Sequence, residues 1–351
     1  MISSFVNTLQ KDLLLIITHY NDLYSLKRCL YSIEKMMGKP RILIVDDFSN
    51  FNQHTDLLEI VNFPNINLIV SKINSGVSCA RNVGIEFAIK ENYKFATFID
   101  CDDLIISNIV IDQLNNFDLV IYNSLEILDQ GDLHNFADFK ILKRNIHNNI
   151  QLELLLKDYI IAPNTVPIIT SCWAKIYKTE ILKKHNILFN QKMSTFEDVD
   201  FLFRYLRYVK TIKYDNNFIY AHTNKHNYKS LTFGKNNNFN KMFGFLQCAR
   251  SLQKLISNQH PKINFNIKHF LGCYYSIQFI RISINMNKIS DLIILYKFVN
   301  KRIESKFLID CFKAYDVYLA NGNHLIKKYI INRSSLLLTF ELVKIARKRY
   351  G

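Results

Sequence analysis

Residues 95–103 join a mostly apolar run to three carboxylates, and this stretch constrains the chain most. The run 95–99 predicts a buried strand, and Asp100, Asp102 and Asp103 follow it directly. Side chains alternate faces along an extended segment, so Asp100 and Asp102 can point the same way while Cys101 turns into the core. Two carboxylates that converge at a strand end repel each other, and a divalent cation with a diphosphate on its far side relieves that repulsion. Asp is also a common turn residue, so an acidic turn without a ligand explains this motif equally well when it is taken alone.

Upstream of this stretch, apolar runs alternate with segments whose apolar residues recur at helical spacing. Strands are expected at residues 13–18, 41–45 and 66–70, helices at 23–36 and 79–90, and a short amphipathic segment at 57–61. Short connections and right-handed crossovers then give a mainly parallel sheet with helices on both faces. The chain has neither a G-x-G-x-x-G nor a G-x-x-x-x-G-K-[ST] motif, so neither a dinucleotide-binding fingerprint nor a P-loop is indicated.

A polar cluster follows each expected strand. The clusters cover residues 18–21, 46–49, 74–78 and 100–103. Ligands of such sheets bind beyond the carboxyl ends of the strands, where all four clusters converge.

Two of these clusters suit a nucleotide. Asp47 is expected to accept the N3 hydrogen of a uracil or to pair with a ribose hydroxyl, unless it closes an Asx turn. The first amides of the helix after residue 78, together with Arg81, suit an anion or a base carbonyl. An N-cap by Ser78 and a surface position for Arg81 explain the same stretch as well.

Further along, two short motifs carry candidate chemistry. Trp173, the chain's one tryptophan, precedes Lys175 by two residues. Together they suit a platform for a sugar ring, although a lone tryptophan is more often a core residue. Glu197 and Asp198 open an amphipathic helix, where either can act as the general base for an attacking hydroxyl. Thr195 and Asp198 also fit a capping box, which gives the acids a structural role instead.

The rest of the chain is expected to be mainly helical. Expected are a strand at residues 118–122, a short helix at 152–159, a hairpin at 214–222, and helices at 239–256, 263–282, 290–303, 308–319 and 335–348. The last helix has an apolar stripe and a basic, aromatic end, which suits a membrane interface or a helical subdomain with a basic solvated face. No apolar stretch reaches the roughly 18 residues that span a bilayer, and the N-terminus lacks the features of a signal peptide.

Charge and cysteine content narrow the class of protein. The formal net charge of +15 favours contact with polyanions, although a compositional bias toward lysine on solvated faces gives the same balance. Seven cysteines without a C-x-x-C pair predict a reducing compartment, no disulfide framework and no zinc site.

The polar motifs occur in the order seen in family 2 glycosyltransferases, which the chain resembles over roughly residues 13–232. The motifs that carry the resemblance are Asp46-Asp47-x-Ser49, Asn74-x-Gly76-x-Ser78-x-Ala80-Arg81-Asn82-x-Gly84, Phe98-Ile99-Asp100-Cys101-Asp102-Asp103, Trp173-x-Lys175-x-Tyr177 and Glu197-Asp198-Val199-Asp200. Each motif is short, and their combination makes the resemblance specific. It implies an α/β GT-A fold, with a C-terminal helical region outside it, and an inverting, metal-dependent transfer from a nucleotide-diphosphate sugar.

The resemblance also implies roles for individual residues. Thr18, Tyr20 and Asp47 hold the nucleobase, Arg81 contacts the base or diphosphate, Asp100 meets the ribose, Asp102 ligates Mn²⁺ or Mg²⁺, Asp198 is the base, and Glu197 shapes the acceptor pocket. From their own motifs, Asn74 is expected in the donor site, and Trp173 and Lys175 are expected to face the acceptor.

This reading divides the chain and names its partners. Residues 1–235 form the transferase domain, with a nucleotide-sugar half at 1–105 and an acceptor half at 106–235, and residues 236–351 form a helical domain. The expected partners are a UDP-sugar and a glycan or lipid-linked acceptor of a bacterial surface polysaccharide. The expected location is the cytoplasm or the inner face of the plasma membrane, with membrane contact through the C-terminal helices. Two alternatives stay open: a non-catalytic nucleic-acid-binding protein, and a GT-A-fold enzyme that transfers a sugar phosphate.

Overall fold

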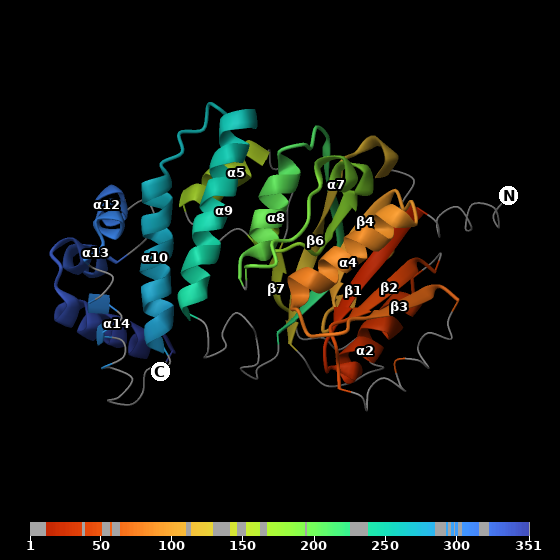
Figure 1. Cartoon of the computed structure of the whole chain (residues 1–351), viewed down its shortest axis with the longest axis horizontal. Coiled ribbons are helices and arrows are strands. Elements are labelled where there is room, and N and C mark those ends of the chain that lie inside the picture. Colours follow the sequence, from red (N-terminus) through yellow and green to blue (C-terminus); the bar gives the residue numbers. More distant parts are fainter. Residues whose placement is uncertain are drawn as a thin grey trace. The chain divides into compact units, whose positions relative to one another are not determined.

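The chain separates into two compact units, one of residues 1–150 and 168–231 and one of residues 151–167 and 232–351. The computed structural model describes residues 12–36, 39–50, 57, 64–109, 114–128, 141–145, 152–161, 167–193, 195–224, 238–284, 293, 296–297, 299–300, 304–315 and 323–350. Figure 1 shows a sheet with helices in the first unit and helices in the second. The domain boundary predicted at residue 235 falls within residues 225–237, outside the described part of the chain, and stays a prediction.

The first unit is built on one mixed sheet. Its strands are β1 (Leu13–His19), β2 (Arg41–Asp46), β3 (Ile66–Val70), β4 (Phe95–Asp100), β5 (Leu104–Ile105), β6 (Leu119–Leu128), β7 (Ile141–Asn145), β8 (Lys175–Lys178) and β9 (Ile212–Asn224). Their order among the described residues is β3-β2-β1-β4-β8-β6-β9-β5, with β7 beside β6. Strands β1 to β4 run parallel, as predicted, whereas β8 pairs antiparallel with both β4 and β6.

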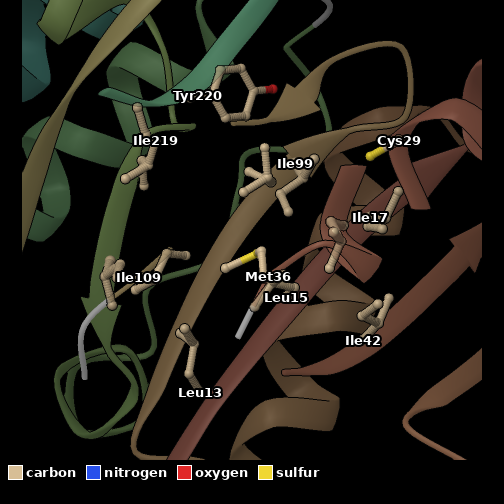
Figure 2. Packing of buried hydrophobic residues seen from close by; sticks show 14 of the residues in the cluster. Leu13, Leu15, Ile17, Cys29, Met36, Ile42, Ile99, Ile109, Ile219 and Tyr220 are labelled. Atoms are coloured by element: carbon tan, nitrogen blue, oxygen red, sulfur yellow. The ribbon is translucent and has the colours of Figure 1, made fainter. Parts of the chain in front are cut away.

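Helices cover both faces of the parallel half because β1 is apolar on both sides. Leu13, Leu15 and Ile17 pack into the cluster that includes residues of α2 (Leu23–Glu34), and Figure 2 shows them beside one another. The alternate residue Ile16 lies against Gly84 of α4 (Val77–Lys90), so closely that a β-carbon at Gly84 would overlap the Ile16 side chain. This close approach fixes α4 on the sheet, and α4 carries Arg81.

The structure gives bounds for further helices in the second half of this unit. They are η2 (Leu114–Asn116), α6 (Pro167–Thr170), α7 (Thr179–His185) and α8 (Glu197–Leu206). The first four predicted strands are confirmed, and β1, β2 and β4 each extend one residue further, into the polar clusters. The predicted segment at 57–61 lies outside the described residues except Leu57, which is buried.

Two local predictions in this unit were wrong. The first turn of α4 begins at Val77 with Gly76 (φ 88°) at the N-cap and no capping side chain, so Ser78 is not its cap. The hairpin predicted at 214–222 is instead part of the single long strand β9, which runs parallel to β6. The pairing shifts between Tyr122–Asp215 and Asn123–Phe218, and residues 216–217 form a bulge there.

The second unit is helical. Among its described residues it includes α5 (Leu152–Ile161), α9 (Asn238–Gln259), α10 (Ile267–Ile284), α12 (Lys306–Ala314), α13 (His324–Ile331) and α14 (Ser335–Tyr350). Helix α10 is central, since it packs against α5, α9, α12 and α14. Five of the predicted helices are confirmed, including the short one at 152–159, and α13 was missed, while the segment at 290–303 lies mostly outside the described residues. In the described part of the chain, every helix is too short or too polar to cross a bilayer.

Candidate functional site

The polar strand ends lie level with one another, because β1 is paired on both sides in parallel register. Thr18 is opposite Val45 of β2 and Asp100 of β4, and His19 is opposite Asp46. The four polar clusters therefore meet at one edge of the sheet, as the sequence predicted.

Arg81 is the centre of this edge. Its side chain is 4% exposed and contacts carboxylates from both halves of the unit. One terminal nitrogen lies 2.8 Å from Oδ1 of Asp100, at the end of β4. The other lies 2.6 Å from Oδ1 of Asp198 and 3.5 Å from Oε1 of Glu197, in the first turn of α8. Arg81 is thus a buried ion-pair partner and not a surface residue.

The three acids exceed the charge of the one guanidinium, and burial magnifies the imbalance. Burial raises the pKa of Glu197, and the neighbouring Asp198 raises it further, while Arg81 lowers it. Burial also raises the pKa of Asp198 against the lowering effect of Arg81. Burial works against the charged form of Arg81, but Asp198 and the other acids raise its pKa well above the usual value. The cluster therefore keeps its cation and disfavours full ionisation of its acids.

The start of α8 sets the position of both acids. Phe196 occupies the N-cap in the left-handed region (φ 66°), and no side chain caps the helix. The Thr195 hydroxyl is buried and has no hydrogen-bond partner in the described part of the chain, so the predicted capping box was wrong. The Asp198 carboxylate is instead held from outside the helix, since Cys172 N donates to Oδ2 of Asp198 at 3.3 Å.

Asp47 is 5% exposed and holds the loop before α4. The backbone amides of Ser75 and Gly76 donate to its two oxygens at 2.9 and 2.7 Å, and the Asn74 side chain donates to its carbonyl at 3.1 Å. The Asx-turn alternative was wrong for Asp47, because its carboxylate is used by another loop. This network places Asn74 beside Asp47 at the entrance to Arg81's helix.

A buried network that sequence reasoning missed joins the ends of β1 and β2. His19 Nδ1 lies 2.7 Å from Oδ1 of Asp46, and Ser49 donates to Asp46 through both its amide and its hydroxyl. The Asn21 amide donates to the Ser49 hydroxyl at 2.8 Å. Burial acts to raise the pKa of Asp46, but the hydrogen bonds from His19 and Ser49 outweigh it, so the pKa of Asp46 is lowered. These bonds fix the end of β1, which carries the half-buried Thr18, and the loop after it, which carries Tyr20, a residue that is 51% exposed.

The acidic turn after β4 divides its carboxylates among different partners. Asp103 is fully buried and accepts hydrogen bonds from the Tyr220 hydroxyl and the Thr223 amide at 2.5 and 2.8 Å. Cys101 packs against the core, as predicted. Asp102 stays half-buried, and its carbonyl accepts a hydrogen bond from Arg28 at 2.9 Å.

The residues around Asp102 fit a hard divalent cation that is completed by substrate. Among the described residues, no group of three or more His, Cys, Asp and Glu side chains forms a ready-made metal site. Magnesium-type sites often use one or two carboxylates, with phosphate oxygens and water as the remaining ligands. A half-buried carboxylate beside an acid-rich cluster matches that donor set, and it does not match zinc.

Trp173 and Lys175 take separate positions in one turn. The Trp173 ring stacks on Tyr220 (centroids 4.6 Å, planes 1° apart) and on His222 (5.6 Å). Lys175 is 1% exposed, and its ammonium donates to oxygens of Ser171 and Trp173. The structure therefore brings Trp173 next to the acidic turn through Tyr220, but it buries the lysine beneath the loop, away from an acceptor in solvent.

The chain resembles known proteins in sequence and in fold. Residues 14–119 match the model of glycosyl transferase family 2. The teichoic acid poly(glycerol phosphate) polymerase of Staphylococcus epidermidis is 25% identical over 206 residues, which are 56% of this chain and 26% of that protein. This chain thus spans only about a quarter of the curated relative.

Solved structures show the same fold. The S. aureus TarS 1-349 complex with UDP-GlcNAc is 16% identical with a TM-score of 0.60, over 96% of this chain and 92% of that one. A longer S. aureus TarS chain is 17% identical with a TM-score of 0.59, over 95% of this chain and 55% of that one. Thr18, Asp47, Arg81 and Asp102 lie within the family match, whereas Asp198 lies beyond it. Residues 14–119 of the chain therefore resemble glycosyl transferase family 2, and the chain shares the GT-A-like fold of the S. aureus TarS structures.

Proposed function

We propose that this chain is an inverting glycosyltransferase that moves a sugar from a nucleotide-diphosphate sugar to a hydroxyl of a glycan or lipid-linked acceptor. The observation that carries the proposal is the shared contact of Arg81 with Asp100 and Asp198. It joins the strand end that would hold the donor to the helix start that would hold the base. The match to glycosyl transferase family 2 supports the reaction class, and the polymerase and TarS likenesses support a role in bacterial surface-polymer synthesis.

Asp198 acts as the general base in this proposal. An acceptor hydroxyl is a poor nucleophile until its proton is removed, and a base whose pKa is raised toward neutral pH removes it most effectively. Burial raises the pKa of Asp198 in that direction. Its two oxygens already accept bonds from Arg81 and Cys172, but each carboxylate oxygen has a second lone pair for the proton.

The donor lies along the first four polar clusters. Thr18, Tyr20 and Asp47 border the nucleobase, Asn74 orders the loop beside it, and Asp100 meets the ribose. Arg81 balances the negative charge of the acids near the diphosphate. Asp102 would hold Mn²⁺ or Mg²⁺, which when bound supplies positive charge to the leaving diphosphate.

The decisive experiment is a donor screen with matched variants. UDP-GlcNAc, other UDP-sugars and a nucleotide-activated glycerol phosphate are tested for transfer and for thermal stabilisation of the protein, with Mn²⁺, Mg²⁺ and EDTA. Asp198→Asn should retain donor binding and lose at least about 10³-fold in kcat, as expected for a missing base that acts in the transition state. Asp215→Asn, at a surface ion pair with Lys213, is the control and should keep full activity. Near wild-type turnover by Asp198→Asn would rule out this base.

The same screen separates the alternatives. The relative's name, a poly(glycerol phosphate) polymerase, favours transfer of glycerol phosphate as the second candidate, and product analysis distinguishes it from sugar transfer. Salt-sensitive binding to random DNA without turnover of any donor would instead favour a nucleic-acid-binding protein.

The distribution of charge suggests where the acceptor is met. Residues 232–351 contain 20 Lys and Arg and 5 Asp and Glu, so the whole net charge of +15 lies in this C-terminal part. Helix α14 exposes Leu336, Leu337 and Phe340, which are 58, 51 and 66% exposed, and its sequence ends in several basic residues. Apolar side chains flanked by cations suit the surface of an anionic bilayer. The seven free cysteines suit the reducing cytoplasmic side.

Vesicle flotation tests this membrane contact. The protein should float with phosphatidylglycerol vesicles and less with phosphatidylcholine vesicles, and Phe340→Asp should weaken flotation. Leu154→Asp, at an exposed leucine on α5, is the control. Equal flotation of the Phe340→Asp protein and wild type would remove α14 from the contact.

A further inference from the structure

We propose that Lys175 is a positioning residue, which holds the turn 171–174 and thereby orients Asp198 and Trp173. The inference rests on the proposed role of Asp198 as the base. It assigns Lys175 to the inside of the site, in place of the acceptor contact that the sequence suggested.

The ammonium group of Lys175 binds one short turn at several points. Its Nζ donates to the carbonyl of Ser171 at 2.9 Å, to the Ser171 hydroxyl at 3.3 Å and to the carbonyl of Trp173 at 3.2 Å. An ammonium has three hydrogens, and these three oxygens account for them. The group therefore ties together both ends of the turn that precedes β8.

The same turn contacts the base directly. Cys172, between the two residues that Lys175 binds, donates its amide to Oδ2 of Asp198 at 3.3 Å, and its carbonyl accepts the Tyr177 hydroxyl at 3.0 Å. A shift of the turn would move this amide and turn the carboxylate. Since Oδ1 is fixed by Arg81 at 2.6 Å, the amide of Cys172 sets the remaining freedom of the base.

The turn needs such a hold because its backbone is unfavourable. Ala174 has φ 55°, in the left-handed region that a residue with a β-carbon seldom adopts. Its carbonyl accepts a hydrogen bond from the amide of Tyr122 on β6 at 3.0 Å. Strained residues persist where surrounding contacts enforce them, and such places cluster at functional sites.

A buried lysine is a costly way to satisfy two carbonyls, which argues against a purely structural role. Burial lowers the pKa of Lys175 to about 8, although Cys172 and Asp198 act in the opposite direction. Among the described residues its hydrogen bonds go to neutral oxygens, whereas Lys178, three residues along, is 31% exposed and lies beside Asp118. The positive charge of Lys175 therefore lies inside the protein, where it interacts with Asp198, and not in solvent.

The lone tryptophan makes the inference measurable. Trp173 lies in the turn, and it stacks on Tyr220 and His222. Its fluorescence therefore reports the position of the turn without any need for turnover.

The test compares Lys175→Met, which keeps the length of the side chain but removes its donors, with wild type and with Lys178→Met as the control. Lys175→Met should lower kcat about 10–100-fold and leave KM for the donor nearly unchanged, because a base displaced by a fraction of an ångström impairs the chemical step. Its Trp173 emission should shift to longer wavelength and become easier to quench with acrylamide. Lys178→Met should match wild type in all three measurements.

The outcomes separate this inference from the proposed function. A folded Lys175→Met protein with wild-type kcat and wild-type emission would overturn it. If circular dichroism shows that Lys175→Met is unfolded, Ser171→Ala is tested instead, because it removes one acceptor of the Lys175 ammonium. It should give a smaller change in both kcat and Trp173 emission, and no change in either would overturn the inference about Lys175. If the wild-type chain transfers no group from any donor, the proposed function fails, but the fluorescence comparison still decides whether Lys175 holds the turn.

Discussion

Replacing Arg81 by methionine would leave three acids of one cluster without their cation. Arg81 makes two short charge-assisted bonds, at 2.8 Å to Asp100 and 2.6 Å to Asp198, and its side chain is 4% exposed. Such bonds contribute about 1.5–3 kcal/mol each, so their loss amounts to about 3–6 kcal/mol. Breaking one partner out of a buried ion pair costs about 3–5 kcal/mol in other proteins, which agrees. We therefore expect Arg81→Met to lower the free energy of unfolding by about 3–5 kcal/mol at pH 7.5.

The loss should depend on pH, because protonation relieves the repulsion that remains. Burial already raises the pKa of Glu197 and of Asp198, and removal of Arg81 deletes the contact that lowers both. At pH 5 these acids take up protons in the variant, so the difference from wild type should shrink.

Urea unfolding followed by Trp173 emission measures the prediction, since the tryptophan belongs to the α/β unit. Lys94→Met, which removes an ion pair with Asp12 from a lysine that is 57% exposed, is the control and should cost about 0–1 kcal/mol. Equal stability of Arg81→Met and wild type at pH 7.5, or a loss that is the same at both pH values, would refute the ion-pair account.

Two further variants test packing and titration. Gly84→Ala should lower the melting temperature and destabilise the fold by about 1–3 kcal/mol, because the new β-carbon overlaps Ile16 of β1. Ala88→Gly on the same helix removes a buried methyl group and is the comparison for a change without overlap. An unchanged melting temperature for Gly84→Ala would contradict the packing. Glu197→Gln should flatten the pH dependence of stability: burial raises the pKa of Glu197 in the folded state, so the native protein binds more protons than the unfolded chain above pH 4.5, and wild-type stability falls as pH rises through that window. Urea midpoints at pH 5 and pH 7.5 measure the slope, and identical slopes in the two proteins would show that Glu197 does not titrate in this way.

The sequence predicted the parallel half of the sheet because its evidence there is local. Each apolar run is bounded by polar residues within a few positions, so both the strand and the edge where it ends can be read directly. The register of β1 with β2 and β4 then follows from ordinary parallel pairing. For the same reason, the convergence of the four polar clusters could be predicted.

The site's pairings were less accessible, because they depend on long-range folding. Arg81 and Asp198 are 117 positions apart, and nothing in either motif specifies the other. The network of His19, Asp46 and Ser49 combines common turn residues that look unremarkable one loop at a time. A buried histidine next to a buried carboxylate becomes visible only when the two strands are paired.

The wrong predictions of a hairpin at 214–222 and of a cap at Thr195 have a common cause. In both, residues that are common in turns and caps have a different role in the folded protein. The residues 215–217, Asp-Asn-Asn, have the composition of a hairpin turn, but they form a bulge in β9, where the Asn123 side chain donates to the Asn216 carbonyl at 2.7 Å. Thr195 has the position of a helix cap, but the left-handed backbone of Phe196 turns the chain before α8 begins. At the bulge a tertiary contact replaces the local hydrogen bond, and before α8 the backbone conformation of Phe196 takes the place of a side-chain cap.

Glu197 and Asp198, the first two of the three acids in the first turn of α8, differ in how firmly they are held. A helix that begins without a side-chain cap leaves its first amides to other acceptors, and its dipole favours negative charge in the first turn. Asp198 is held by both Arg81 and Cys172, whereas Glu197 meets Arg81 at the longer distance of 3.5 Å. The more tightly oriented carboxylate is the better base, because proton transfer requires a fixed geometry, and the looser one can adapt to different acceptors. Substitution of Asp198 should therefore reduce kcat for every acceptor, while substitution of Glu197 should change the preference among acceptors. Assays with two acceptors of different size distinguish these effects. An equal loss of kcat for both acceptors in Glu197→Gln would show that the two acids share one role.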